Sequence, residues 1–314
     1  MTRDATPGQE PAFRARHDLG QNFLRDEQVL ADIVASARTL LPERDPREAP
    51  IDVIEIGPGT GQLTEALLTA GYRVTALEID TRLETLLDQR LGHYEHFQLR
   101  LGDAADQDLA RLSDHEQCPV LGISNLPYYV TTPLITQYLT QLPFASGFIV
   151  MVQTDVLTRL RPSRNPSESI KRRGPVQILG EAYGSVDLLR HVPSQAFDPV
   201  PRVGSSLLVY RPHRNPSSAQ QYYLEHAADF ADYLETAFTQ RRQTLGKNIR
   251  NWLQRTRDQS TSDSAETIEH IFAPYPELAT QRAEQLSTEQ HLLLAPPHVS
   301  ASWLRIRGSP VIAI

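Results

Sequence analysis

Asn125, Pro127 and Tyr128 form a short run of residue types that can act on a flat substrate. They lie in the stretch SNLPYYVTT, residues 124–132, at the end of the apolar run PVLGIS. Such a run is typical of a buried parallel strand, and open α/β sheets bind ligands at the carboxyl ends of their strands. An amide, a main-chain carbonyl before proline and a flat ring at that edge can hold a planar group. The alternative is an ordinary strand-to-helix turn, because Asn and Pro are common turn formers.

A second run whose residue types could bind a ligand is VIEIGPGTG, residues 53–61. It ends a predicted strand and enters a helix through three glycines. Glycine lets the backbone approach a ligand closely and accepts positive φ. Glu78 and Asp80 follow at the end of the next predicted strand, where a carboxylate can bind two ribose hydroxyls. Dinucleotides and S-adenosylmethionine are both bound by this layout.

The spacing of the glycines separates these two cofactor classes. A dinucleotide pattern G-x-G-x-x-G that starts at Gly57 requires glycine at position 62, which is Gln62. Gly61 instead completes E-x-G-x-G-x-G, a pattern common to class I methyltransferases. Gly102-Asp103, after the third predicted strand, adds an acid that can accept a hydrogen bond from an adenine amine. The sequence therefore predicts S-adenosylmethionine as the cofactor, against the alternative of a structural glycine turn with surface acids.

The elements that must position these residues alternate between strand and helix over the first two hundred residues, which predicts an α/β fold with a parallel sheet. The segments with helical spacing are 61–70 and 81–91. The predicted parallel strands are 51–56, 72–79, 97–101, 119–124 and 147–152.

The second half of the chain has a different pattern. Residues 185–192 and 204–210 have no helix-length crossover between them and are predicted to form an antiparallel pair. Residues 211–219, RPHRNPSSA, are the predicted domain linker. Beyond them the chain is predicted to be mostly helical, most clearly over 220–240 and 241–257.

Composition restricts the class of protein. At 314 residues the chain is long enough for two domains, and residues 1–16 are predicted to be a disordered lead-in. The single Cys118 excludes an internal disulfide and agrees with a reducing cytoplasm. No apolar run approaches the ~20 residues of a membrane span. We expect a cytoplasmic monomer that needs neither a membrane nor a metal ion.

Charge is unevenly distributed along the chain. The net charge is −7, yet residues 159–173 carry six Lys or Arg against the single acid Glu168. Residues 241–257 carry another six and no acid. Solvated surface explains many such runs, but two of them on an acidic chain favour localised contact with phosphate groups.

With a methyl donor predicted, Asn125-Leu126-Pro127-Tyr128 resembles motif IV of the amino-methylating enzymes, [DNS]-[LIP]-P-[YFW]. The resemblance implies that Asn125 Oδ1 and the Leu126 carbonyl accept the two N–H groups of an adenine amine. The nitrogen lone pair, otherwise delocalised into the ring, is then directed at the methyl group. Tyr128 would stack on the base and hold it out of its helix or loop.

Further stretches resemble the KsgA-type ribosomal RNA adenine dimethyltransferases: LGQNFLRD at 19–26, FDPVPRVGSSLL at 197–208, RRQTLGKNI at 241–249 and RAEQLSTEQ at 282–290. The resemblance implies a Rossmann-like methyltransferase domain over residues 17–210 and a small C-terminal helical, RNA-binding domain over 220–314. It also implies dimethylation of two adjacent adenosines in the 3′-terminal hairpin loop of small-subunit (16S) ribosomal RNA or a pre-30S particle.

The resemblance and the glycine pattern together give two sets of predicted site residues. Phe197 is implied to stack on the adenine opposite Tyr128, although a packing role before a Pro-rich turn is equally consistent with its position. The cofactor-binding set is Asn22, Leu24, Gly57, Gly59, Glu78, Asp103 and Asn125. The catalytic set is Asn125, Leu126, Pro127, Tyr128 and Phe197.

The chain departs from the family pattern at Thr154-Asp155, where Lys-Glu is usual, and in the segment that follows. Three other functions remain as alternatives: an erythromycin-resistance-type methyltransferase of 23S ribosomal RNA, a non-catalytic ribosome assembly factor, and a nicotinamide oxidoreductase. The LGQNFL and RAEQLS stretches disfavour the first, the intact Glu78, Asp103 and Asn125 disfavour the second, and Gln62 disfavours the third.

Overall fold

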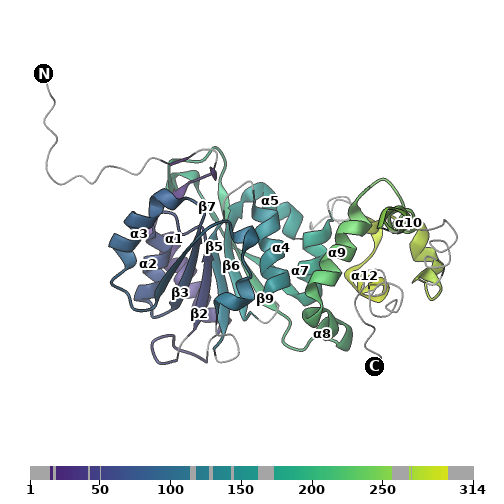
Figure 1. Cartoon of the computed structure of the whole chain (residues 1–314), viewed down its shortest axis with the longest axis horizontal. Coiled ribbons are helices and arrows are strands. Elements are labelled where there is room, and N and C mark those ends of the chain that lie inside the picture. The colour runs from purple at the N-terminus through teal and green to yellow at the C-terminus, as the bar shows by residue number, and fades with distance from the viewer. Residues whose placement is uncertain are drawn as a thin grey trace, which may run out of the picture.

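A mostly parallel sheet with helices on both faces forms one half of the molecule in a computed structural model of the chain (Figure 1). A group of helices from the C-terminal part of the chain forms the other half. The structure describes residues 15–16, 19–41, 43–49, 51–113, 118–126, 130–142, 145–161, 173–256, 269 and 271–295.

The sheet has seven strands in the order β4-β3-β2-β5-β6-β9-β7. The first five in this order are parallel, while β9 runs antiparallel to both β6 and β7. The predicted parallel strands and the predicted antiparallel pair are therefore confirmed. The strands are β2 (Asp52–Ile56), β3 (Arg73–Glu78), β4 (Phe97–Leu101), β5 (Val120–Asn125), β6 (Gly147–Gln153), β7 (Gly184–Val192) and β9 (Ser205–Pro212).

Helices cover both faces of this sheet, which explains why the central strands are continuous apolar runs. In β2, Val53 packs in the cluster beneath the first layer, whereas Ile54 and Ile56 pack in the cluster beneath the second. The first layer is α1 (Glu27–Leu40), α2 (Gln62–Thr69) and α3 (Glu84–Leu91). The second layer is α4 (Thr131–Gln141), α5 (Thr154–Leu160) and α7 (Pro175–Tyr183).

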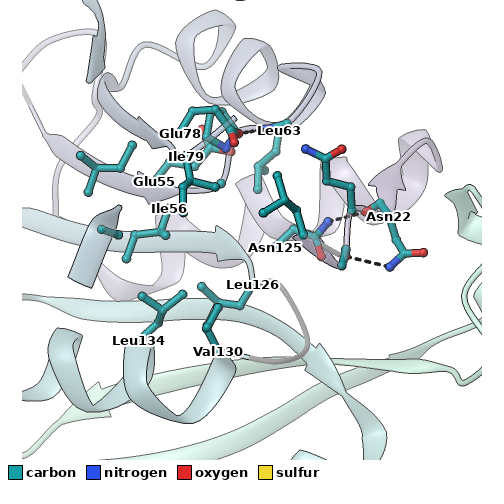
Figure 2. Close-up of a pocket in the computed structure, with 18 of the residues that line it drawn as sticks. Asn22, Glu55, Ile56, Leu63, Glu78, Ile79, Asn125, Leu126, Val130 and Leu134 are labelled. Carbon is teal, nitrogen blue, oxygen red and sulfur yellow. Dashed lines mark hydrogen bonds between the residues drawn. The ribbon is translucent and has the colours of Figure 1, made fainter. Parts of the chain in front are cut away.

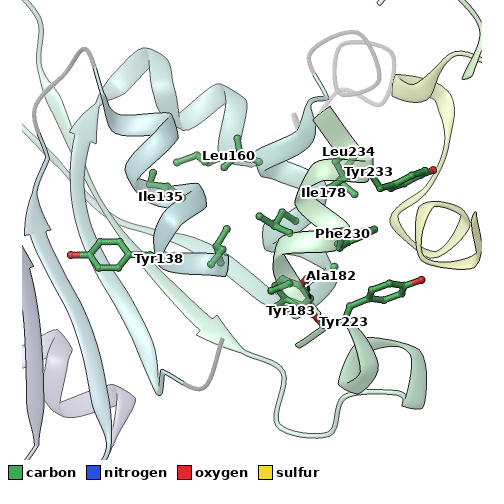
Figure 3. Packing of buried hydrophobic residues seen from close by; sticks show 14 of the residues in the cluster. Ile135, Tyr138, Leu160, Ile178, Ala182, Tyr183, Tyr223, Phe230, Tyr233 and Leu234 are labelled. Carbon is green, nitrogen blue, oxygen red and sulfur yellow. Dashed lines mark hydrogen bonds between the residues drawn. The ribbon is translucent and has the colours of Figure 1, made fainter. Parts of the chain in front are cut away.

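The C-terminal helices pack on the second layer. They are α8 (Ser218–Glu225), α9 (Ala227–Phe238), α10 (Leu245–Thr256) and α12 (Thr288–Leu294). Buried residues form one continuous cluster from the sheet through α4 and α7 into α9 (Figure 3). The Tyr183 hydroxyl of α7 donates to the Tyr223 carbonyl of α8 at 3.0 Å within this cluster. Burial of side chains from both halves thus joins the helical region to the sheet.

Three boundaries differ from the sequence-based prediction. The single helix expected over 220–240 is divided at His226, whose ring stacks on Tyr222 with centroids 4.1 Å apart. The next helix begins at Leu245 rather than at 241. The expected linker includes the last residues of β9 and the first of α8, so the connection is only residues 213–217.

Three other expectations concern the N-terminal lead-in, membrane spans and metal sites. Of the predicted lead-in, residues 1–14 lie outside the described residues. Within the described ranges, no helix is long and apolar enough to cross a membrane. The described residues also contain no group of three or more His, Cys, Asp or Glu side chains placed to hold a metal ion.

Candidate active site

A pocket opens at the carboxyl ends of β2, β3 and β5, the edge at which an α/β sheet binds ligands (Figure 2). Its floor is the glycine turn after β2, and one wall is the segment that contains the short strand β1 (Phe23–Leu24). All seven residues predicted to bind the cofactor line this pocket. They are Asn22, Leu24, Gly57, Gly59, Glu78, Asp103 and Asn125.

The glycine turn has a conformation that other residues rarely adopt. Gly57, Gly59 and Gly61 have φ of 73°, 56° and 84°, in the left-handed region. A Cβ on Gly59 would lie 2.7 Å from Cδ1 of Phe23, so this glycine also allows β1 to approach the turn. Gly61 is the N-cap residue of α2. The turn is therefore shaped to expose main-chain groups to a ligand.

Glu78 supports the turn from the end of β3. Its Oε2 accepts the N–H of Gly59 at 3.1 Å, and its Oε1 accepts the N–H of Asp80 at 2.9 Å. Only 4% of the residue is exposed, and burial raises the pKa of the Glu78 carboxyl, while these backbone hydrogen bonds act in the opposite direction. Each oxygen has a second lone pair with which it can accept a ribose hydroxyl.

Asp80, the other acid at the end of β3, has a different role. Arg82 donates to both of its oxygens, at 2.8 and 2.6 Å, and Gln21 Nε2 donates to Oδ2 at 2.8 Å. These hydrogen bonds, that of Arg82 above all, lower the pKa of Asp80 to about 2. Asp80 does not line the pocket and instead holds the N-terminal segment against it through Gln21.

Asp103 lies at the rim of the pocket, after β4. Its Oδ1 accepts the N–H of Ala105 at 2.9 Å and begins a short 3-10 turn. The residue is exposed, which suits an acceptor for an adenine amine. Ile79, a large apolar residue that is 44% exposed, also lines the pocket and presents an apolar surface to it. The acid and the apolar wall together suit an adenosine group.

Glu55 was not among the predicted site residues, although it begins the glycine pattern. It is fully buried at the base of the pocket, and within the described structure its Oε2 has no hydrogen-bond partner. Burial raises the pKa of Glu55 to about 8, and the nearby Glu78 carboxylate adds to the shift. A buried acid with an unpartnered oxygen beside a pocket is a polar group that a ligand can satisfy.

Asn125 ends β5 and lies beside Asn22 in the pocket that the glycine turn also lines (Figure 2). Its Nδ2 donates to the carbonyl of Asn22 at 3.1 Å, and the Asn22 side chain in turn donates to the Gly20 carbonyl at 3.0 Å. Leu126 is buried, and its N–H donates to the Met151 carbonyl at 3.1 Å. Pro127 and Tyr128 lie outside the described residues. The structure thus brings together the first two residues of the NLPY motif with the cofactor-binding set.

Comparisons with known proteins agree with this geometry. The family model described as ribosomal RNA adenine dimethylase matches residues 12–271. The ribosomal RNA small subunit methyltransferase A of Bacillus licheniformis is 34% identical, over 90% of this chain and 91% of its own length. The protein of the same name from Chromohalobacter salexigens is 36% identical, over 80% of this chain and 86% of its own. The chain belongs to the ribosomal RNA adenine dimethylase family.

Solved structures agree with this fold. A dimethyladenosine transferase from Plasmodium falciparum has a TM-score of 0.61 at 18% identity, over 91% of this chain and 98% of its own. The 23S rRNA methyltransferase ErmE has a TM-score of 0.54 at 21% identity, over 87% and 99%. At these identities the likeness shows the fold, a Rossmann-like class I methyltransferase. S-adenosylmethionine, predicted from the glycine spacing, is the cofactor of this dimethylase.

Phe197 of the dimethylase does not lie in the pocket. It belongs to β8 (Phe197–Asp198), pairs with Leu24 of β1, and is only 2% exposed in the core beneath the first helix layer. In this structure the ring has no free face on which a base can stack. The structure thus shows Phe197 packed in the core, while its stacking on an adenine stays a prediction.

Some basic side chains of the two runs contact other parts of the fold, and others are exposed to solvent. Of the first run, residues 162–172 lie outside the described residues, while Arg173 pairs with Glu181 at 2.6 Å. In the second run, Arg241 donates to the Arg173 carbonyl at 2.6 Å. Helix α10 buries Leu245, Ile249 and Leu253. It exposes Lys247 and Arg250, and Arg242 lies exposed just before it. Within the described structure no ion pair involves these three exposed residues.

Proposed function

We propose that this dimethylase transfers two methyl groups to N6 of each of two adjacent adenosines in the 3′-terminal hairpin loop of small-subunit ribosomal RNA. The proposal includes action in the cytoplasm on RNA in a pre-30S particle. The observation that carries it is Asn125, which lines the same pocket as the glycine turn and has its amide nitrogen bound to the Asn22 carbonyl. The names of the relatives, small subunit methyltransferase A, support the choice of RNA.

The pocket fits S-adenosylmethionine on several independent features. Gly57 and Gly59 line the pocket and have positive φ, a conformation that presents main-chain groups to a ligand. Glu78 offers acceptors for ribose hydroxyls, while Asp103 and Ile79 suit the adenine ring. Glu55 has an unpartnered oxygen at the base of the pocket. When bound, this cofactor supplies an electrophilic methyl group to an amine.

The residues of the chain then have to bind and orient the adenine amine. In the proposal, Asn125 Oδ1 and the Leu126 carbonyl accept its N–H groups, which directs the nitrogen lone pair toward the methyl donor. Such preorganised acceptors act through placement and electrostatics, and no strong base is required. After the first transfer one N–H remains, so a single acceptor suffices to orient the second. Tyr128 retains its expected role of stacking on the base.

The last part of the proposal is that the helical half of the molecule binds the RNA. We assign RNA docking to residues 220–314, with the methyltransferase domain over 17–210, because α10 exposes Lys247 and Arg250. The erythromycin-resistance-type alternative has only a likeness of fold to ErmE in its favour. Two relatives named as small subunit enzymes, at 34% and 36% identity, favour the small subunit.

The test is to map dimethyladenosine in ribosomal RNA from cells with and without this gene. We expect two adjacent dimethyladenosines near the 3′ end of small-subunit RNA, lost on deletion and restored by the wild-type gene. Loss of these marks on deletion, together with no methyl transfer by the purified wild-type protein, would support a non-catalytic assembly factor instead. Loss of a mark in large-subunit RNA alone would support the erythromycin-resistance-type enzyme.

A further inference from the structure

The seven-stranded sheet divides at the edge where the pocket lies. β2 and β5 are paired only as far as Ile54 and Gly122. Beyond that point β2 stays paired with β3 to its end at Ile56, and β5 stays paired with β6 to Asn125. The ends of two neighbouring strands therefore separate, and each is held by its outer neighbour. The glycine turn follows one of these ends, and Asn125 lies on the other.

A chain of side-chain hydroxyls crosses this opening in place of the missing main-chain hydrogen bonds. The N–H of Ile56 donates to Ser124 Oγ at 2.8 Å, Ser124 Oγ lies 2.6 Å from the Tyr138 hydroxyl, and that hydroxyl donates to the Ile54 carbonyl at 3.1 Å. Because the Tyr138 hydroxyl donates its proton to the Ile54 carbonyl, the Ser124 hydroxyl must donate its proton to the Tyr138 oxygen. The three hydrogen bonds then run in one direction, from the Ile56 N–H through Ser124 and Tyr138 to the Ile54 carbonyl.

The ring that carries this hydroxyl is itself fixed in place. Tyr138 comes from α4 and points toward the strands, as Figure 3 shows, and its ring stacks on Phe148 with centroids 5.1 Å apart. Gly122 makes room for the crossing, since a Cβ there would lie 2.9 Å from Cε1 of Tyr138 and 2.5 Å from Cδ1 of Phe148. The hydroxyl therefore reaches the opening on a rigid support.

We propose that Ser124 and Tyr138 are positioning residues for methyl transfer, which set the separation between the glycine turn and Asn125 through this hydroxyl chain. The inference rests on the proposed function, because Asn125 must orient the amine for the separation to matter. In this inference the glycine turn and Asn125 are held in place by different contacts. The glycine turn, on the cofactor side, is held to β3 by the hydrogen bond of 2.9 Å from the Gly57 N–H to the Leu77 carbonyl. This bond does not involve Ser124 or Tyr138.

The test compares Tyr138→Phe and Ser124→Ala with Tyr183→Phe as a matched control. Tyr183 is equally buried and its hydroxyl donates to a main-chain carbonyl, but it lies in the contact with α8, away from the pocket. Single-turnover methylation of small-subunit particles at saturating cofactor should fall about tenfold to 10²-fold in the first two variants, as for an ångström-scale misplacement. It should stay within twofold of wild type in Tyr183→Phe.

Two further measurements separate positioning from simple loss of stability. Cofactor affinity by calorimetry should stay within about threefold in all three variants, because the glycine turn remains held by β3. Hydrogen exchange of the Ile56 amide should accelerate in Ser124→Ala and not in Tyr183→Phe. The double variant should be no slower than the slower single variant, since both act through one chain.

Transfer rates in Tyr138→Phe and Ser124→Ala equal to those of Tyr183→Phe would overturn the inference, as would a loss of cofactor affinity that accounts for the whole rate effect. Failure of the proposed function has a different signature. In that case the wild-type protein itself transfers no methyl group to small-subunit particles, while the exchange rate of the Ile56 amide still reports on the hydroxyl chain.

Discussion

The side-chain amide of Asn125 donates to the main-chain carbonyl of Asn22 at 3.1 Å, and this contact determines which end of the amide is available to the pocket. A carbonyl accepts only from the amide nitrogen, so Oδ1 remains as the acceptor. Within the described residues, no donor is bonded to that oxygen. The N-terminal segment therefore orients the residue proposed to bind the adenine amine, although the two residues are separated by 103 positions.

Asn125→Ala should slow methyl transfer by roughly 10²–10³-fold, as for the loss of one preorganised hydrogen-bonding group. Asn125→Asp keeps an acceptor oxygen but places a carboxylate against the Asn22 carbonyl, so it should also be slower than wild type. Single-turnover rates with saturating cofactor measure both. Calorimetry should show a smaller effect on cofactor binding. A wild-type rate in Asn125→Ala would reduce the NLPY motif to a strand-to-helix turn.

Glu78→Ala should weaken S-adenosylmethionine binding by roughly 1.5–3 kcal/mol, the cost of losing a charge-assisted hydrogen bond. The change also leaves the Gly59 N–H without its acceptor, so the turn loses support. Glu84→Ala is the matched control, since that carboxylate is exposed on α3 nearby in the chain. Calorimetric titration of each variant with cofactor measures the difference. Equal cofactor affinities in the two variants would mean that Glu78 does not bind the cofactor.

Glu55 makes stability depend on pH. Its pKa is about 8 in the folded protein, against an ordinary value of 4.5. Below pH 4.5 both the folded and unfolded states are protonated, so its contribution is fully present there. Between pH 4.5 and 8 the unfolded state releases the proton while the folded state keeps it, so the free energy of unfolding falls as pH rises.

Glu55→Gln should remove this dependence. Its free energy of unfolding relative to wild type should therefore rise between pH 5 and pH 8, by an amount on the order of a few kcal/mol. Denaturant unfolding at both pH values measures the change. Glu84→Gln should show no such trend, because its side chain is exposed. A constant difference between Glu55→Gln and wild type would mean that Glu55 is ionised in the folded protein.

The sequence was sufficient to predict the sheet, because buried parallel strands leave long apolar runs and their carboxyl ends carry the polar motifs. It also located Glu78, Asp103 and the glycine turn, since each lies directly after a predicted strand. Other parts depend on contacts between distant residues. The pairing of Ser124 with Tyr138 crosses from a strand to a helix and has no local signal. The burial of Phe197 depends on its pairing with β1, 173 positions earlier in the chain.

The acids at the end of β3 show the same limit. Glu78 and Asp80 are equivalent by type and position, so spacing alone does not separate them. The structure distinguishes them because Arg82 and Gln21 bind Asp80, while Glu78 faces the glycine turn. Similarly, both basic runs are conspicuous in the sequence, but only the packing of α10 reveals which of the second run's described cations face solvent and which support the fold.

The last prediction concerns those exposed cations. Replacing Arg242, Lys247 and Arg250 by Gln should weaken RNA binding and flatten its dependence on salt, because each lost phosphate contact no longer releases a counterion. If all three contact phosphate, the slope of log affinity against log salt should become shallower by about 2–3 units. Arg241 is left in place, since it donates to the Arg173 carbonyl and its loss would disturb packing.

The matched control replaces three exposed arginines of the part of the chain that forms the sheet: Arg38 of α1, Arg44 in the loop after α1, and Arg100 of β4. It removes the same charge, so a general electrostatic effect would appear equally in both triple variants. Binding of small-subunit RNA at several salt concentrations, with cofactor affinity measured in parallel, separates the two cases. Cofactor binding should be unchanged in both, because neither set lines the pocket. A slope as steep as wild type in the α10 variant would mean that this basic face is only solvated surface.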